Sequence, residues 1–442
     1  MPQDIKLKKQ TKYKLKGSLQ ISGDKSISHR SLILSSMALG EAKITNLLES
    51  EDTLSTIKIL KALSIQIKKV KDDWIVIGNG TNGYIQPSEA LDCGNSGTTA
   101  RLMLGAVSTN PIFCTFIGDK SLSKRPMTRV TNFLNTVGAE TVLTNKDYFP
   151  MTISGAEDPL PLHHRITKAS AQVKTALILA ALNIMGRTSI IETRKTRDHT
   201  EILLKYLKVK FKVIKQQDNA TKLVFNGPYE IEAKNIFVAG DPSSAAFFIV
   251  AALIVPNSKI ILKNVCLNKT RIEYISILKK MGAKIKVEKG KTRSGELIGS
   301  IQVEYSKLKA VNIPKGLSPY LIDEYPILSI AASVAKGTTK MNGLEELRYK
   351  ESDRIKSIHE NLKKLKINCS VKKDDISITG STINPNGGVK IKTFGDHRIA
   401  MSFKIMSLIC DKQLSFDDLE CINISYPDFN KHLNSLKVEN GL

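Results

Sequence analysis

The chain has 442 residues, enough for about two or three domains with a sizeable core. Its 41% hydrophobic and 24% charged residues are the proportions of a soluble globular protein, and no segment approaches the roughly 18 apolar residues of a membrane-spanning helix. The 66 Lys and Arg against 42 Asp and Glu give a formal charge of +24. Because the lysines are spread along the whole chain, a solvated lysine-rich surface is favoured over a nucleic-acid or other polyanion site.

The cysteines show neither a CxxC pair nor the His spacing of a zinc site, so they are expected to be reduced thiols. The first residues contain no apolar signal-peptide core, and the stretch before the first strong motif is short for a transit peptide. We therefore expect a cytoplasmic protein. The six cysteines are Cys93, Cys114, Cys266, Cys369, Cys410 and Cys421.

The predicted elements follow a recurring order. The Lys6–Lys16 stretch alternates lysine with apolar residues and is predicted to be an edge strand. Gly23-Asp24-Lys25-Ser26 then opens an apolar helix over 31–39. A short β-type run at 43–47 follows, and then an amphipathic helix with an alternating strand over 56–70.

The same order returns in the second half of the chain. Gly240-Asp241-Pro242-Ser243-Ser244 opens an apolar helix over 245–253, a β-type run follows at 260–265, and a second helix with a strand spans 272–287. The remaining copies begin after Asn95, Ser170, Asp323 and, less completely, His397.

Six copies that start roughly 70–80 residues apart predict repeated supersecondary units. The expected fold is α/β (α+β), with two halves of three units each. The two Gly-Asp points are predicted to be hinges near 23 and 240, so that residues 1–23 with 241–442 form one domain and 24–240 the other. A cleft between hinged domains would be a natural ligand site.

Three short motifs have less specific interpretations. Gly78-Asn-Gly80-Thr-Asn-Gly83 matches GxGxxG, but no helix is predicted at the third glycine, so a turn is favoured over a dinucleotide site. Gly23-Asp24-Lys25-Ser26 lacks the spacing of a P-loop. His163-His164 lies on a proline-rich connection without matching Cys or carboxylate spacing, so no metal site is expected.

Five segments share one design, in which a cation or hydroxyl lies at the start of a predicted helix. Free backbone N–H groups attract anions there. The segments are Lys25-Ser26 with Arg30 one turn later, Gly94-Asn-Ser-Gly-Thr-Thr-Ala-Arg101, Ser123-Lys-Arg-Pro-Met127, Ala169-Ser-Ala-Gln-Val-Lys174 and Gly395-Asp-His-Arg398.

Two further segments carry carboxylates. Glu351 and Arg354 are three residues apart on a predicted helix, and Asp323-Glu324 precede a long apolar helix. Taken alone, the first pair is more often an ordinary helix ion pair and the second an N-terminal cap. Only their combination with the five segments favours a binding site.

Together these strings resemble the enolpyruvylshikimate-phosphate synthase family, in its second sequence class, from about Lys14 to Phe429. The strings occur here in the family's order. They are Gly-Asp-Lys-Ser-x-Ser-His-Arg, Gly-Asn-Ser-Gly-Thr-Thr-Ala-Arg, Arg-Pro-Met, Ser-Ala-Gln-Val-Lys, Arg-Asp-His-Thr-Glu, Lys-Glu-Ser-Asp-Arg and Asp-His-Arg-Ile-Ala-Met.

The resemblance implies a fold of two domains with three βαβαββ units each, and two anionic substrates. For shikimate-3-phosphate it implies binding by Lys25, Ser26, Arg30, Ser170, Ala171, Gln172, Arg197, Asp323 and Lys350. For phosphoenolpyruvate it implies Lys25, Asn95, Gly97, Thr98, Arg125, Gln172, Arg354 and Arg398.

The mechanism that the resemblance implies is addition followed by elimination. Asp323 accepts the proton of the shikimate 5-hydroxyl, Glu351 protonates the methylene carbon of phosphoenolpyruvate, and the tetrahedral adduct loses phosphate. A carboxyl group among many cations normally stays ionised, so Glu351 needs burial or a suitable neighbour to act as an acid. Lys25 competes for part of the proton transfer. Neither a metal nor an organic cofactor is implied.

The chain departs from the resemblance at one position. Members of the other class carry a lysine shortly before the C-terminal aromatic-Pro step, where this chain has Ile424. Either another cation substitutes, or the phosphoenolpyruvate site is one charge weaker. Gly97 has no side chain to narrow its pocket, which leaves sensitivity to the mimic glyphosate open.

Two alternatives belong to other substrate classes. The enolpyruvyl transferases that act on a UDP-aminosugar carry a cysteine in a mobile loop, and the region 120–128 has none here. A nucleic-acid-binding protein would need clustered basic stripes with exposed aromatics, whereas aromatics are 6% of this chain. The expected partners are small-molecule substrates only, with no nucleic acid and no membrane, and the expected state is a monomer.

Overall fold

The computed structural model describes residues 13–381 and 383–439. Its contacts divide the chain into two compact units. Unit 1 comprises Met1–Ile21, Gly240–Lys291 and Ile298–Leu442, and unit 2 comprises Ser22–Ala239 and Thr292–Leu297. The chain therefore passes from one unit to the other four times. The two hinges expected from the sequence stay a prediction.

Unit 2 contains three copies of one supersecondary motif, in which a parallel strand pair continues into an antiparallel hairpin. The first copy has the strand order β13-β2-β4-β3. Its elements are α1 (Lys25–Ser36), β2 (Leu39–Thr45), α2 (Glu51–Ala62), β3 (Gln66–Val70), β4 (Asp73–Asn79) and β13 (Ile236–Phe237).

The other two copies of unit 2 repeat this pattern, with the orders β5-β6-β8-β7 and β11-β12-β10-β9. The elements of the second are β5 (Leu91–Asp92), α3 (Gly97–Val107), β6 (Phe113–Ile117), η1 (Leu122–Lys124), α4 (Thr128–Leu134), η2 (Asn135–Val137), β7 (Glu140–Thr144) and β8 (Tyr148–Ser154). Those of the third are β9 (His163–Ile166), α5 (Ala171–Ala181), β10 (Gly186–Glu192), α6 (His199–Tyr206), β11 (Phe211–Lys215) and β12 (Thr221–Gly227).

Unit 1 contains three more copies. The first has the order β15-β16-β14-β1-β23, with β1 (Tyr13–Gln20), α7 (Pro242–Ile254), β14 (Lys259–Cys266), α8 (Glu273–Lys280), β15 (Lys284–Arg293), β16 (Glu296–Glu304) and β23 (Lys437–Glu439). The second has the order β17-β18-β20-β19, with β17 (Asn312–Ile313), η3 (Lys315–Leu317), α9 (Ser318–Leu321), α10 (Tyr325–Ser333), β18 (Gly337–Met341), η4 (Glu345–Tyr349), α11 (Arg354–Lys364), β19 (Asn368–Lys372) and β20 (Asp375–Gly380).

The last copy is reduced to a parallel pair among the described residues. Its elements are β21 (Lys390–Ile391), α12 (His397–Met406), β22 (Ser415–Phe416), η5 (Glu420–Ile424) and α13 (Phe429–Leu436). The predicted mixed α/β fold with six repeats, the sixth less complete, is confirmed.

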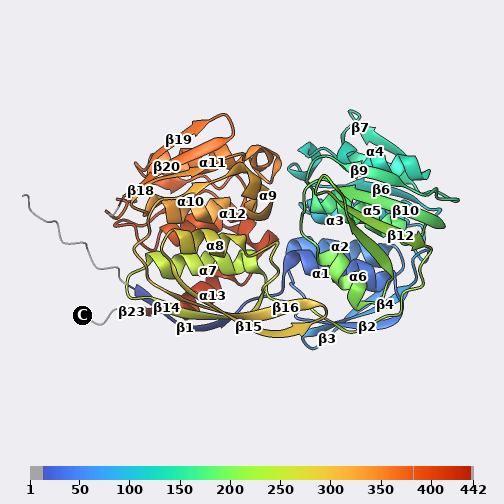
Figure 1. The fold of residues 1–442 in the computed structure, drawn as a ribbon, viewed down its shortest axis with the longest axis horizontal. Coiled ribbons are helices and arrows are strands. Elements are labelled where there is room, and N and C mark those ends of the chain that lie inside the picture. The colour runs from blue at the N-terminus through green and yellow to red at the C-terminus, as the bar shows by residue number, and fades with distance from the viewer. Residues whose placement is uncertain (1–12, 382, 440–442) are drawn as a thin grey trace, which may run out of the picture. The chain divides into compact units, whose positions relative to one another are not determined.

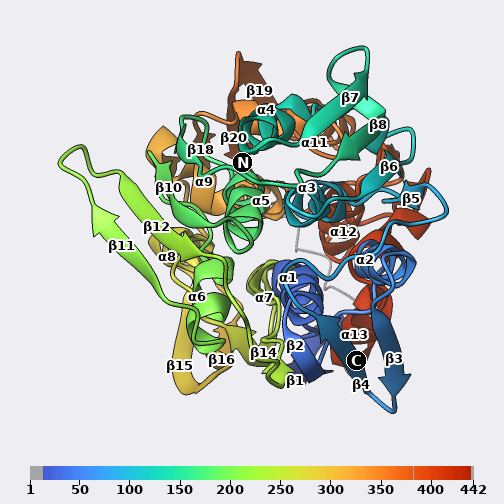
Figure 2. The same ribbon diagram turned by 90° about the vertical axis from the view of Figure 1, so that its right-hand side faces the viewer.

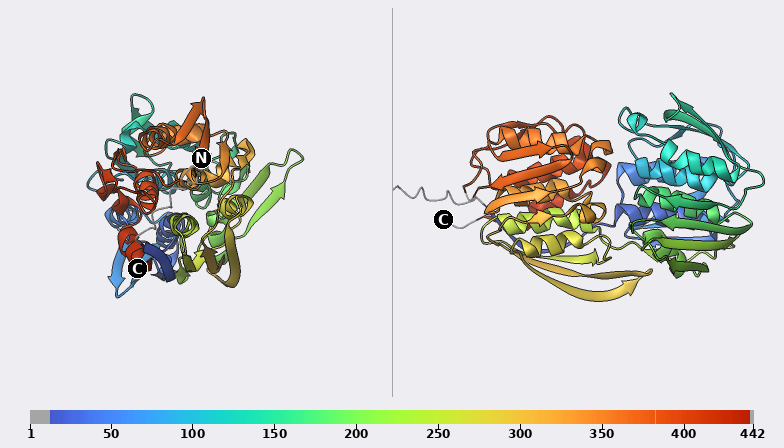
Figure 3. Two further views of the ribbon diagram at one scale, coloured as in Figure 1. Left: turned by 90° about the vertical axis from the view of Figure 1, so that its left-hand side faces the viewer. Right: turned by 45° about the horizontal axis from the view of Figure 1, so that its top comes forward.

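The core of each unit is built around helices that are buried on nearly every side. All residues of α7 are buried, and α7 packs against α10 and α12, as Figure 1 shows for unit 1. The left panel of Figure 3 views the helices of this unit nearly end-on. In unit 2, α3 packs against α1 and α5, and the sheets lie outside them (Figure 2). A helix buried all round needs neighbours on every face, which fixes where its N-terminus lies.

Three local predictions can be compared with these elements. The predicted edge strand is wrong for its described part, because β1 lies between β14, its parallel neighbour, and β23, its antiparallel neighbour. The rest of that stretch lies outside the described residues. The GxGxxG match forms a turn after β4, as predicted. His163 and His164 belong to strand β9 and not to a loop, and the His163 ring bonds the Ser189 hydroxyl at 3.0 Å.

The tip of the β15–β16 hairpin, Thr292–Leu297, belongs to unit 2, although most of both strands lies in unit 1. Within unit 2, the Glu296 carboxylate contacts the His199 ring at 2.5 Å, and both side chains are buried. The Arg293 guanidinium lies 3.4 Å from the centroid of the Phe237 ring. No motif in the sequence indicates that this hairpin tip belongs to the other unit.

No helix among the described residues is long and apolar enough to cross a membrane.

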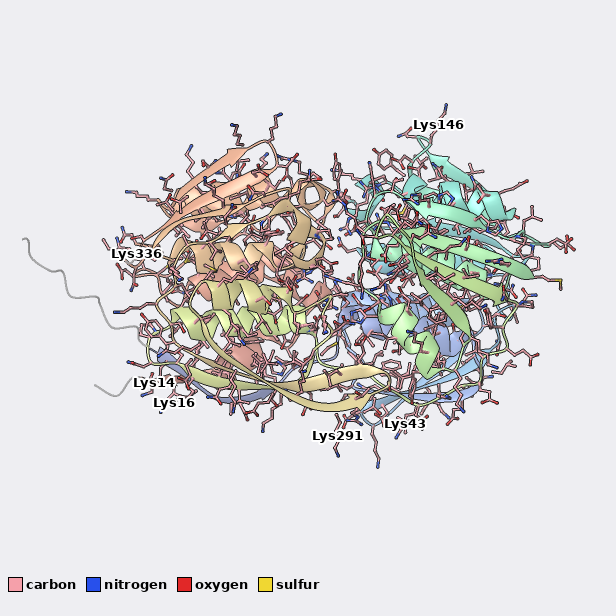
Figure 4. The ribbon with its side chains drawn as sticks, in the orientation of Figure 1. Lys14, Lys16, Lys43, Lys146, Lys291 and Lys336 are labelled. Carbon is pink, nitrogen blue, oxygen red and sulfur yellow. The ribbon has the colours of Figure 1, made fainter. Side chains whose placement is uncertain are left out.

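The positive charge is distributed over many segments. The lysines labelled in Figure 4 project outward from β1, β2, the β7–β8 turn, β15 and the segment before β18, a spread that fits a solvated surface. They are Lys14, Lys16, Lys43, Lys146, Lys291 and Lys336.

Candidate active site

The first site element of unit 2 is the N-terminus of α1. Asp24 caps it, since its Oδ1 accepts from the backbone N–H of Ile27 at 2.8 Å. Lys25 is the first helical residue, and its Nζ donates to Oδ2 of Asp52 on α2 at 2.9 Å. The Lys25 side chain is 14% exposed, so the ion pair holds a cation at the helix end without burying it completely. Ser26 beside it is half-buried.

Arg30 lies one turn into α1 and is buried. Its Nε donates to the Thr200 hydroxyl at 2.8 Å, its Nη2 to the Thr175 hydroxyl at 2.9 Å, and its Nη1 to the Ser26 carbonyl at 2.9 Å. The guanidinium therefore connects α1 to both α5 and α6. The structure gives it a bracing role that the sequence did not reveal.

The second element is the N-terminus of α3, where Arg101 of α3 and Arg125, which follows η1, lie close together. The Ser96 hydroxyl caps the helix by accepting from the Thr99 N–H at 3.1 Å. Arg125 is buried, and its Nη2 donates to Oδ1 of Asn95 at 3.0 Å. An ideal Cβ placed on Gly97 would lie 2.8 Å from Nη1 of Arg101 and 3.2 Å from Nη1 of Arg125. Glycine thus allows both guanidinium groups to approach the helix end closely.

The third element is the N-terminus of α5. Ser170 caps it, accepting from the Val173 N–H at 3.3 Å, and Ala171 is the first helical residue. Gln172 links this element to the second, because its Oε1 accepts from Arg101 Nη1 at 2.9 Å and its Nε2 donates to the Thr98 hydroxyl at 2.9 Å. 

Arg197 is half-buried in the loop that precedes α6. The site residues predicted in this half of the chain therefore all lie at or near the N-terminal ends of α1, α3, α5 and α6.

The site residues of unit 1 form a compact ionic cluster around Arg354. The Arg354 side chain is 1% exposed, and its Nε donates to Oδ2 of Asp396 at 2.8 Å. Its Nη2 donates to Oε2 of Glu351 at 2.6 Å and its Nη1 lies 3.4 Å from Oδ1 of Asp323. Burial alone would lower the pKa of Arg354, but Asp396, Glu351 and Asp323 raise it above its ordinary value, so the guanidinium stays charged.

Asp323 has two further cationic neighbours. Lys350 Nζ lies 3.4 Å from its Oδ1, and Arg398 Nη1 donates to its backbone carbonyl at 3.1 Å. Arg398 follows the N-cap of α12, where Oδ1 of Asp396 accepts from the Arg398 N–H at 2.9 Å. The Asp323 side chain is 13% exposed, so a ligand atom can reach this carboxylate. Unit 1 thus holds carboxylates and cations in contact, an arrangement suited to proton transfer beside a bound anion.

One prediction about this cluster is wrong. Glu351 was expected on a helix with Arg354, but α11 begins at Arg354 with Asp353 as its cap, and Glu351 lies before it. The pair forms because the turn brings the two side chains together. The alternative interpretation of Asp323-Glu324 as a capping pair, which the combined motifs outweighed, is not supported, since Glu324 precedes α10 without a side-chain capping bond. Its carboxylate instead accepts from the Ser243 hydroxyl.

Three residues that hold the site residues were not among those predicted to bind a substrate. Asp52 pairs with Lys25 from another helix and belongs to no motif. Arg101 ends a segment identified from the sequence but was assigned to no substrate, and Asp396 lies two residues before Arg398 in another such segment, where that spacing could have identified it. Ile424, which occupies the position where members of the other sequence class carry a lysine, is the half-buried last residue of η5.

Comparisons with known proteins bear on this geometry. The family model described as EPSP synthase (3-phosphoshikimate 1-carboxyvinyltransferase) matches residues 9–433. The 3-phosphoshikimate 1-carboxyvinyltransferase of Petrotoga mobilis is 45% identical over 426 residues, covering 96% of this chain and 97% of that protein. The protein of the same name from Zymomonas mobilis is 43% identical over 430 residues, covering 96% and 95%.

Solved structures give the same relation at the level of fold. An EPSP synthase from Acinetobacter baumannii is 36% identical with a TM-score of 0.85, covering 98% of each chain. The enolpyruvyl transferase NikO from Streptomyces tendae has a TM-score of 0.71 at 14% identity, covering 97% of each chain, which shows a shared fold alone.

Proposed function

Since the chain belongs to the EPSP synthase family, we propose that the charged groups described above bind and activate its two substrates. The reaction itself follows from the family. The protein transfers the enolpyruvyl group of phosphoenolpyruvate to the 5-hydroxyl of shikimate-3-phosphate, through a tetrahedral intermediate, and releases phosphate in the shikimate pathway to aromatic amino acids.

The helix ends of unit 2 are the proposed anion sites. Each substrate carries a phosphate and a carboxylate, and arginine matches the geometry of both oxyanions. Arg125 and Arg101 meet at Gly97, where backbone N–H groups of α3 add to their charge. We assign phosphoenolpyruvate to this end of α3. Shikimate-3-phosphate, the acceptor of the enolpyruvyl group, is assigned to the N-terminal ends of α1 and α5 and to Arg197.

The cluster of unit 1 is proposed to carry out the proton transfers. Asp323 takes the proton of the 5-hydroxyl as that oxygen attacks C2 of phosphoenolpyruvate. Glu351 lies 2.6 Å from the charged Arg354, and a cationic neighbour favours an ionised carboxylate, so Glu351 must take up a proton before it delivers one to C3, which becomes a methyl group. In the elimination, the methyl group returns a proton to Glu351, the C2–O bond to phosphate breaks, and the phosphate leaves with the proton that Asp323 took from the 5-hydroxyl. Lys25, held by Asp52, is suited to assist the departing phosphate and part of the proton transfer.

One observation carries the assignment of Asp323 as the base. Its carboxylate is in ionic contact with Lys350 and Arg354, yet is partly exposed. Cationic neighbours keep a carboxylate ionised, and exposure lets a hydroxyl reach it. We propose that each remaining predicted residue binds the substrate to which the family resemblance assigns it. We further propose that the protein acts as a cytoplasmic monomer without a cofactor.

The test is release of phosphate by the purified full-length protein given phosphoenolpyruvate with shikimate-3-phosphate, and given each substrate alone. We expect release only with both, and a loss on the order of 10²-fold or more in Asp323→Asn. Asp374→Asn is the matched control, since Asp374 pairs with Arg348 and is 40% exposed outside the site. No release by folded wild-type protein would contradict the activity. Equal rates in the two variants would contradict only the role of Asp323.

A further inference from the structure

Two of the motifs end in charged residues that the proposed site does not use. Lys174 ends Ser-Ala-Gln-Val-Lys, and Glu201 ends Arg-Asp-His-Thr-Glu. In the structure these two motif ends meet, because Lys174 Nζ lies 2.7 Å from Oε1 of Glu201. Glu192, the last residue of β10, completes the cluster at 3.1 Å from the same nitrogen.

The Lys174–Glu192–Glu201 cluster is almost fully buried. The side chains are 1%, 5% and 10% exposed, respectively. Taking such charges out of water is costly, and well-packed apolar residues are often as stable in their place. Lys174 also faces the core from α5, whose other buried residues are mostly Ala, Leu, Ile and Val. Stability alone therefore gives no reason for an ionic cluster at this point.

The cluster contains one cation and two carboxylates. Burial alone would lower the pKa of Lys174, but Glu201 and Glu192 raise it above its ordinary value, so the ammonium stays charged. Within the part of the chain that the structure describes, Oε2 of Glu201 is buried without a hydrogen-bond partner. The geometry is thus held by the ammonium, which both carboxylates share.

Each member of the cluster is one helical turn or one short loop from a residue assigned to the acceptor. The Lys174 N–H donates to the carbonyl of Ser170 at 3.1 Å in the first turn of α5. Oε1 of Glu192 accepts from the N–H of Thr196 at 2.8 Å, the residue before Arg197. Glu201 lies four residues after Arg197 on the same short stretch.

A second contact beside the cluster ties the same segments together. Thr175 and Thr200, the neighbours of Lys174 and Glu201, are hydrogen-bonded through their hydroxyls at 2.7 Å. Arg30 donates to both hydroxyls. The start of α5 and the first turn of α6, which follows the loop that carries Arg197, are therefore cross-linked by two sets of buried polar contacts.

We propose that Lys174, Glu192 and Glu201 are positioning residues for the phosphorylated acceptor. They fix the N-terminus of α5, with Ser170 and Gln172, relative to the loop that carries Arg197. None of the three contacts the substrate. This inference rests on the proposed assignment of the acceptor to that end of unit 2, and it explains why the two motif ends carry opposite charges.

The test compares Lys174→Met with Lys69→Met, because Lys69 is a partly exposed lysine of the same unit that pairs with Glu49 at 2.7 Å. Steady-state phosphate release is measured while each substrate is varied separately. In Lys174→Met we expect the KM for shikimate-3-phosphate to rise about tenfold or more, with the KM for phosphoenolpyruvate within about twofold of wild type. Lys69→Met should leave both unchanged, and Lys174→Arg, which keeps the charge, should restore part of the acceptor KM.

The outcomes separate this inference from the site assignment. Arg197→Ala is measured in the same series. If it raises the acceptor KM while Lys174→Met does not, or if Lys174→Met raises both KM values alike, the positioning role is wrong. If Arg197→Ala leaves the acceptor KM unchanged, the acceptor assignment fails and the inference fails with it. Should Lys174→Met not fold, calorimetric binding of shikimate-3-phosphate to Glu201→Gln is judged by the same criterion, with an expected weakening of about threefold or more.

Discussion

Replacing Gly97 with alanine tests the proposed phosphoenolpyruvate site most directly. The new Cβ would lie 2.8 Å from Nη1 of Arg101 and 3.2 Å from Nη1 of Arg125. Ordinary contact begins at 3.4 Å, so the Arg101 guanidinium must move by the difference, about 0.6 Å, and that of Arg125 by about 0.2 Å. Both atoms are at the ends of flexible side chains, so the backbone does not have to move.

The expected effects on binding and on stability have opposite signs. Misplacing a binding group by 1 Å can cost about 100-fold, so a shift of about 0.6 Å should raise the KM for phosphoenolpyruvate on the order of tenfold. Gly97 is the first residue of α3 and is not in the left-handed region, so alanine should stabilise the fold by about 0.4–1 kcal/mol.

Steady-state kinetics with each substrate varied, together with urea unfolding, measures both effects. Thr109→Ser is a suitable control, since Thr109 is buried beyond the other end of α3. If Gly97→Ala left the phosphoenolpyruvate KM within about twofold of wild type, or raised the KM of the acceptor instead, the assignment of this helix end would be wrong.

Three other predictions concern the remaining charged groups. Asp396→Asn removes the charge of a fully buried partner of Arg354 and should lower the free energy of unfolding, measured by urea unfolding, by about 3 kcal/mol. A change below about 1 kcal/mol would show that this buried ion pair does not stabilise the fold. Glu351→Gln should lower kcat about 100-fold or more in rapid-quench turnover with little effect on either KM, and an unchanged kcat would exclude it as the acid. Burial, with Lys25 and Arg30 nearby, holds the pKa of His29 well below its ordinary value, so protonation favours the unfolded chain. Urea titrations should therefore show stability falling below about pH 6.5, by about 2 kcal/mol at pH 5, with a smaller slope in His29→Gln.

The repeated fold was predictable because each copy contains the same local signals. An apolar helix opened by Gly-Asp, a short β-type run and an alternating strand are all set by residues near one another in sequence. The anion-binding helix ends were predictable for the same reason, since Lys25, Gly97, Ser170 and Arg398 lie at or beside the start of helices.

The missed features depend on contacts between distant segments. Asp52 meets Lys25 only because α1 and α2 pack together, and no pattern around Asp52 indicates this. The edge position of β1 was wrong because its neighbour β23 comes from the far end of the chain. The apolar run after Asp323 predicted a helix, but the side-chain contacts of Glu324 depend on Ser243 in another repeat. Local patterns carry no information about such pairs.

The hairpin tip Thr292–Leu297 has a consequence for synthesis on the ribosome. Unit 2 is otherwise complete when Ala239 has emerged, but its buried His199 still lacks Glu296, which is translated later. Domains generally fold as units in the order in which they are made. Here the earlier-made unit lacks one buried carboxylate until part of the following unit has been translated. A truncated chain that ends at Ala239 would leave His199 without the Glu296 carboxylate, so the two units are coupled in translation.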